Sequence, residues 1–175
     1  MEAALSRTQT RLIVAGYSAV AVASAGLLFM RYLQYALHPQ DADKYGTMWA
    51  FGDWILGVFI AGLFLLPTVF LAWTLAKSEA AYTTYAKVVL GISLTAPLST
   101  ALLSIPAVNN GWLLGGPCLY RLLAFPAVVM LEGFSYALAR FPRPKKLTLF
   151  ALLIEIGTLV FNIGSMFVTA MSHHK

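Results

Sequence analysis

Residues 48–76, MWAFGDWILGVFIAGLFLLPTVFLAWTLA, decide the fold class because this stretch is almost continuously apolar. Its single charged residue is Asp53. A helix of about 20 apolar residues crosses the hydrocarbon core of a bilayer, and this run is longer than that. The stretch therefore predicts a transmembrane helix that is tilted or extends past the interface.

The composition of the whole chain supports the same environment. Of the 175 residues, 59% are hydrophobic and only 11% are charged, whereas soluble domains have roughly 25% charged residues. So few charged side chains cannot cover a water-facing surface, and we expect lipid to surround most of the molecule. The net charge of +5 is carried mainly by short segments between apolar runs, which indicates membrane topology and no nucleic-acid partner.

Further apolar runs of this kind cover residues 12–30, 88–108, 116–139 and 147–171. The run 88–108 is the least regular, because Pro97 and Pro106 interrupt it. With residues 48–76, these runs predict an all-α integral membrane protein. We expect one domain over residues 1–175, folded as a bundle of five transmembrane helices.

The positions of the basic residues predict the orientation of this bundle. If the N-terminus is inside, the inner segments hold Arg7, Arg11, Lys77, Lys87, Arg140, Arg143, Lys145 and Lys146. The outer segments then hold only Arg31, Lys44 and Lys175. Basic residues favour the cytoplasmic side, so we expect an inner N-terminus and an outer C-terminus.

Polar side chains follow one face of each of the last two spans. Residues three, four or seven positions apart share a face of a helix. On the fourth span these residues are Arg121, Glu132 and Ser135, and on the fifth they are Glu155, Thr158, Asn162, Ser165 and Thr169. We expect the two polar faces to meet or to line a shared cavity.

Glu132 and Glu155 are the central residues of these faces. Glu132 precedes Arg140 by eight residues, and Glu155 follows Lys146 by nine, so each lies roughly 12–14 Å from the basic loop. Two carboxylates at one depth cannot both stay ionised in a low dielectric without a cation. The predicted site, for polar packing or for a proton or cation, comprises Glu132, Ser135, Glu155, Thr158 and Asn162.

Asp53 and Arg121 are a second candidate pair. Asp53 lies five residues after Met48, and Arg121 four after Pro117, so both enter the membrane from the outer side. Their matching depth and opposite charge predict an intramembrane ion pair, with Arg31 as the alternative partner of Asp53. A buried pair of this kind more often fixes helix register than performs chemistry.

The remaining chemistry-bearing residues predict no cofactor site. His38, His173 and His174 are weak metal-ligand candidates on the outer side, without a supporting carboxylate spacing. The single cysteine, Cys118, excludes an internal disulfide. Pro67, Pro97 and Pro126 lie within spans and can kink them.

Short loops leave little room for a water-facing active site. We therefore expect a non-enzymatic subunit or accessory protein of a larger membrane assembly, docked on other membrane subunits or on itself. One alternative is a proton- or cation-coupled carrier that uses the two glutamates. Another is a lipid- or quinone-binding protein, with Tyr120, Phe125 and Tyr136 near a ring. The bacterial cytoplasmic membrane is the expected location.

Overall fold

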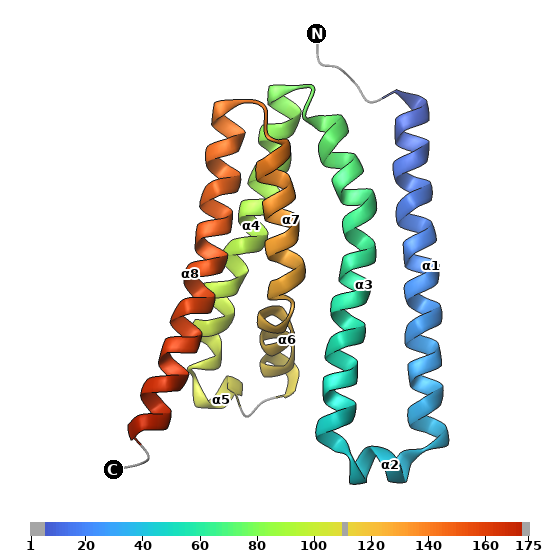
Figure 1. Cartoon of the computed structure of the whole chain (residues 1–175), viewed down its shortest axis with the longest axis vertical. Helices are drawn as coiled ribbons and strands as arrows, with labels where there is room; N and C mark the ends of the chain where they lie inside the picture. The colour runs from blue at the N-terminus through green and yellow to red at the C-terminus, as the bar shows by residue number, and fades with distance from the viewer. Residues whose placement is uncertain (1–5, 110–111, 173–175) are drawn as a thin grey trace. The chain divides into compact units, whose positions relative to one another are not determined.

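The computed structural model describes residues 6–109 and 112–172, and this part of the chain consists of helices without strands. Figure 1 shows their order along the chain. The helices are α1 (Arg7–Leu37), α2 (Pro39–Lys44), α3 (Gly46–Leu75), α4 (Glu79–Leu103), α5 (Pro106–Asn109), α6 (Trp112–Leu123), α7 (Phe125–Leu138) and α8 (Pro142–Ser172). The all-α prediction is confirmed.

Four of these helices, α1, α3, α4 and α8, are long and apolar enough to cross a membrane. The bent pair α6 and α7 makes a fifth span if it is counted as one. Large apolar side chains point outward on these helices: Val22 is 73% exposed, Leu66 69% and Phe167 65%. Such surfaces are compatible with an integral membrane protein, in which lipid covers them.

The predicted fourth span over 116–139 is not one helix. It consists of α6 and α7, which meet at Ala124 with a bend of 51°. Pro126 explains the break, because proline has no N–H to donate and its ring clashes with the carbonyl four residues earlier. That carbonyl belongs to Leu122 in the last turn of α6.

The bounds of the third span also differ from the prediction over 88–108. Helix α4 begins earlier, at Glu79, where Ser78 caps it by accepting a hydrogen bond from the Ala81 N–H. It ends at Leu103, and Pro106 starts the separate short helix α5. A hydropathy pattern misses the first turns of α4 because they mix polar and apolar residues. The same pattern continues past Pro106 because the residues around this proline are still apolar.

The described chain divides into two compact units, which we treat separately: α1–α3, up to Thr74, and α4–α8, from Leu75. In the α1–α3 unit, α1 and α3 run antiparallel and α2 connects them (Figure 1). The Tyr17 hydroxyl and Thr68 Oγ1 are 2.8 Å apart. A Cβ added to Gly16 would lie 3.3 Å from Cβ of Pro67, so glycine permits a close approach of the two helices here.

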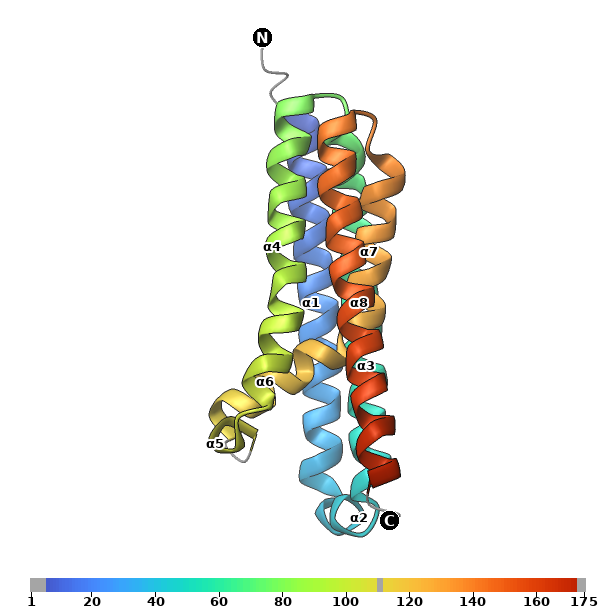
Figure 2. The ribbon, with the colours of Figure 1, turned by 90° about the vertical axis from the view of Figure 1, so that its left-hand side faces the viewer.

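In the α4–α8 unit, α4 packs against α6, α7 and α8. Figure 2 shows α4, α7 and α8 side by side, with α7 running opposite to the other two. The core of this unit is rich in small and polar side chains, including Ala86, Ser93, Glu132, Ser135, Ala151 and Glu155. The buried Tyr82 hydroxyl donates a 2.5 Å hydrogen bond to the Ser135 carbonyl and so joins α4 to α7.

Candidate functional site: a buried polar layer in the α4–α8 unit

Both glutamates of the predicted site, Glu132 and Glu155, lie inside the α4–α8 unit. Glu132 on α7 is 0% exposed and Glu155 on α8 is 2% exposed. Removing a carboxylate from water is costly unless a cation or hydrogen bonds compensate it. The groups that surround each carboxyl therefore decide what this site can do.

Glu155 forms a bidentate ion pair with Arg121. Arg121 Nη1 donates to Glu155 Oε1 at 2.9 Å, and Nη2 donates to Oε2 at 2.7 Å. This fork geometry is the strongest form of an arginine–carboxylate pair. The negative charge of Glu155 is thus compensated by a residue in the last turn of α6, directly before the break at Ala124.

Helix α4 holds the other side of the Arg121 guanidinium. Arg121 Nε donates to Thr95 Oγ1 at 2.6 Å, and Nη2 donates to the Ile92 carbonyl at 3.1 Å. Thr95 Oγ1 in turn donates to the same carbonyl at 2.5 Å. The arginine therefore links α6 to both α4 and α8, and these bonds fix its orientation.

Glu132 has a different partner. Ser93 on α4 forms a hydrogen bond with Glu132 Oε1, and the Ser93 hydroxyl also lies 3.0 Å from the Val89 carbonyl. Glu132 Oε2 is buried without a hydrogen-bond partner among the described residues. No cation binds Glu132 directly in the described part of the chain, so its environment is less polar than that of Glu155.

Helix α4 brings the two acids to nearly one level of the bundle. Ile92, Ser93 and Thr95 contact the two acid clusters, and they span about 4.5 Å of helix axis at 1.5 Å per residue. We call Ser93, Thr95, Arg121, Glu132 and Glu155 the polar layer. The contribution of α4 was not predicted, although Ser93 and Thr100 are seven residues apart and therefore share a face of that helix.

The other members of the predicted site lie outside the polar layer. Asn162 Nδ2 donates to Thr100 Oγ1 and to the Thr158 carbonyl, both at 2.9 Å, and joins α8 to α4. Thr158 Oγ1 donates to its own helix at Ile154. Ser135 Oγ lies 2.8 Å from the Tyr85 hydroxyl. The side chain of Thr169 lies outside the described residues.

The predicted pairing of Asp53 with Arg121 is replaced by two other pairs. Arg121 binds Glu155, while Asp53 Oδ1 accepts a 2.5 Å bond from Arg31 Nε. Asp53 Oδ2 accepts a further 2.5 Å bond from the Tyr35 hydroxyl. Arg31, the alternative partner, is thus the observed one. Matching depth in the membrane did not identify neighbours, because it gives no information about which helices touch.

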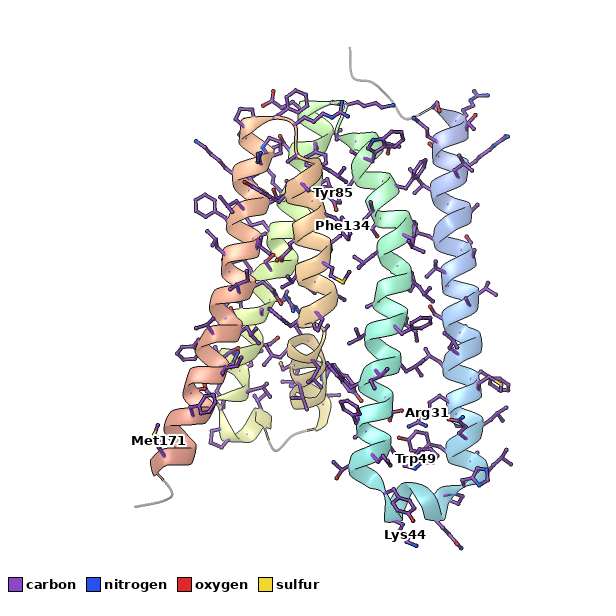
Figure 3. All side chains as sticks on the ribbon, viewed as in Figure 1. Arg31, Lys44, Trp49, Tyr85, Phe134 and Met171 are labelled. Atoms are coloured by element: carbon purple, nitrogen blue, oxygen red, sulfur yellow. The ribbon has the colours of Figure 1, made fainter. Side chains whose placement is uncertain are left out.

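Two aromatic rings enclose Arg31 in the α1–α3 unit. Its guanidinium carbon lies 4.4 Å from the centre of the Trp49 ring and 4.8 Å from that of Tyr35. Nη2 also donates to the Trp49 carbonyl at 2.9 Å. Figure 3 shows Arg31 and Trp49 between α1 and α3, close to the α2 connection. These contacts join α1 to α3 near the end at which α2 connects them.

Two of the cavities along α8 are lined by residues of more than one helix of the α4–α8 unit. One, of about 370 Å³, is walled by α4, α6, α7 and α8 and is lined by Phe125, Glu155, Thr158 and Asn162 among mostly apolar residues. Of the predicted ring-contacting residues, only Phe125 lines it. Tyr120 is 58% exposed, and the Tyr136 ring lies 5.1 Å from Lys145 Nζ.

The second cavity is a surface groove of about 590 Å³ between α4 and α8. We call it the α4/α8 groove. Its lining includes the small residues Pro97, Thr100, Ala101, Ser104, Gly157 and Thr158. Leu153 and Phe161, at its rim, are 55% and 65% exposed, so the groove opens on the surface of the unit.

The metal-ligand candidates form no cluster in the described residues. No group of three or more His, Cys, Asp or Glu side chains in residues 6–109 and 112–172 is placed to hold a metal ion. His38 caps the C-terminus of α1, where its backbone N–H donates to the Gln34 carbonyl. His173 and His174 lie outside the described residues.

Comparison with known proteins identifies no relative of this chain. No protein-family model matches it, and neither the curated proteins nor the solved structures contain a significant match.

Proposed function

We propose that this chain is a non-enzymatic subunit or accessory protein of a larger membrane assembly. The observation that carries this proposal is the α4/α8 groove, with its volume of about 590 Å³ and its lining of small residues. Small residues let the backbones of two helices approach closely, which drives association in lipid. The groove is suited to a transmembrane helix of a partner.

The polar groups of the groove support packing rather than chemistry. Thr100 Oγ1 already accepts from Asn162, and Thr158 Oγ1 donates within α8. In the polar layer, Glu155 is neutralised by Arg121 and Glu132 is 0% exposed. Glu132 is therefore closed to a substrate, and Glu155, although it lines the cavity of about 370 Å³, is already held by Arg121. Both acids hold helices together.

The test is extraction into native-like lipid particles followed by mass measurement and identification of copurifying chains. A complex of fixed stoichiometry is the expected result. Gly157→Leu should reduce the amount of complex at least tenfold, because Gly157 lines the groove and a leucine there projects into the space that a partner helix would occupy. A Cβ added at Gly157 meets nothing within 4 Å.

The matched control is Gly133→Leu on α7. Gly133 also has open space around an added Cβ, and it does not line the groove. This variant should keep the complex. A monodisperse single chain from the wild-type protein, or equal loss of the complex in both variants, would overturn the proposal.

The break between α6 and α7 favours a second candidate, a proton- or cation-coupled carrier. Discontinuous helices next to intramembrane charges are common at transporter sites, and Arg121 lies beside this break. In a carrier, Glu132→Gln and Glu155→Gln abolish pH-dependent flux in proteoliposomes while the protein stays folded. Undiminished flux in both variants eliminates this candidate.

The cavity of about 370 Å³ favours lipid or quinone binding as a further candidate function. Its size lies within the range of small-molecule sites, and its apolar lining with a few polar groups suits an amphiphile. Organic extraction of the purified protein would then yield a lipid or quinone at a fixed molar ratio. A lower molar ratio of this lipid or quinone to protein in Phe125→Ala would show that the molecule binds in the cavity.

The proposal also includes the orientation of the chain and its location in the cell. The basic ends Arg7, Arg11, Lys145 and Lys146 support an inner N-terminus and an outer C-terminus. We place the protein in the bacterial cytoplasmic membrane. Labelling in intact cells of a cysteine introduced at either end, in a Cys118→Ser background, tests the orientation.

A further inference from the structure

We infer that the polar layer binds one proton, held by Glu132 on its Oε1 atom and donated to Ser93. The layer contains two carboxyl groups and one guanidinium, and Arg121 is committed to Glu155 by both of its Nη atoms. One proton makes the layer neutral. This inference concerns the charge of the layer and is independent of the proposed function.

The count of hydroxyl hydrogens is the first argument. Ser93 has one hydroxyl hydrogen but two acceptors, the Val89 carbonyl at 3.0 Å and Glu132 Oε1. If Glu132 were ionised, both contacts would compete for that hydrogen. If Glu132 carries a proton, it donates to Ser93 Oγ and Ser93 donates to Val89, so each contact has its own hydrogen.

The neighbouring charges are the second argument. Arg121 on α6 and Glu155 on α8 are the charged neighbours of Glu132 in the polar layer, because Arg121 contacts the same turn of α4 as Glu132 does, and the two neutralise each other. The titratable groups of α4 near this part of α7 are the phenols of Tyr82 and Tyr85, which bond to Ser135. None of these groups supplies a second positive charge for an ionised Glu132.

The unpartnered oxygen is the third argument. Glu132 Oε2 is buried without a hydrogen bond among the described residues. On a neutral acid this atom is a carbonyl oxygen, for which the loss of hydration has only a modest cost. On an ionised acid it would share a full charge in a medium that stabilises charge poorly, at a much higher cost.

The two acids are therefore coupled through Arg121. Replacing Glu155 by glutamine removes the counter-ion of Arg121 and leaves a positive charge near Glu132. The proton of Glu132 then dissociates, because the ionised acid compensates the arginine. The wild-type protein keeps the proton as long as Glu155 holds the arginine.

Infrared spectroscopy of the full-length protein in lipid nanodiscs at neutral pH tests this inference. A protonated carboxyl group has a C=O stretching band well separated from the bands of a carboxylate. We expect this band in the wild type, its loss in Glu132→Gln, and its retention in Glu79→Gln, which changes an exposed acid at the start of α4. Glu155→Gln should lose at least half of the band.

Ser93→Ala provides a second measurement that does not depend on a change at Glu132. It removes the acceptor of the acid proton, so the band should shift to higher frequency and keep its intensity. Absence of the band from the wild type, its persistence in Glu132→Gln, or an unchanged frequency in Ser93→Ala would overturn the inference.

Discussion

In the described residues, each of the two units contains an arginine–carboxylate pair, and the two carboxylates differ greatly in exposure. In the α1–α3 unit, the side chains of Arg31 and Asp53 are 19% and 31% exposed. In the α4–α8 unit, those of Arg121 and Glu155 are 15% and 2% exposed. The first pair lies near the end of a helical hairpin, and the second joins three helices inside a bundle.

The comparison shows that the same two chemical groups need different support. Arg31 lies against the rings of Tyr35 and Trp49 and keeps partial contact with the surroundings. Arg121 donates hydrogen bonds to Glu155, Thr95 Oγ1 and the Ile92 carbonyl, and its carboxylate partner is only 2% exposed. A buried polar group that loses its partner is costly. The buried pair should therefore be much more sensitive to the loss of one partner.

Of the changes considered, removal of Arg121 should lower the free energy of unfolding most. Arg121→Met leaves Glu155 buried without its counter-ion, which should lower the free energy of unfolding by about 3–5 kcal/mol. Reversible unfolding in mixed micelles measures this. The double variant Arg121→Met/Glu155→Met should recover most of the loss, because no charge remains. Equal losses in the single and double variants would contradict the prediction.

Asp53→Asn should have an intermediate effect in the α1–α3 unit. Partly exposed pairs contribute about 0.2–1 kcal/mol, and asparagine retains one acceptor oxygen for Arg31 or Tyr35. Added salt should reduce the difference between Asp53→Asn and the wild type, but not the difference caused by Arg121→Met. A cost for Asp53→Asn as large as that of Arg121→Met would remove the distinction between the pairs.

Loss of the uncharged contact between α8 and α4 should change the free energy of unfolding least. Asn162 donates to Thr100, and hydrogen bonds between transmembrane helices contribute about 0.6 kcal/mol on average. A double-mutant cycle of Asn162→Ala and Thr100→Val in the same micelles isolates this term. A coupling energy above 2 kcal/mol would place the polar contact on the level of the buried ion pair.

Local sequence predicted much of the fold and part of the site. Long apolar runs identified the helices, and the spacing of Glu132 and Glu155 from the basic loop predicted two acids at a similar depth. Hydropathy outlined residues 116–139 as one span, and the bend in this span occurs near Pro126, one of the prolines expected to kink a span. The predicted pairing of Arg121 with Asp53 was wrong, since helix order does not state which faces touch. The role of Ser93 required the position of α4 relative to α7.

The sequence by itself determined the helical architecture and the presence of helices long and apolar enough to cross a membrane, because hydrophobic length and the need to satisfy backbone groups internally act on each segment separately. Tertiary structure alone decided which charges compensate each other. Pairing depends on the rotation and position of neighbouring helices, and these are set by the packing of the whole α4–α8 unit. A single arginine beside two acids, at one level of that unit, is a property of the packed helices.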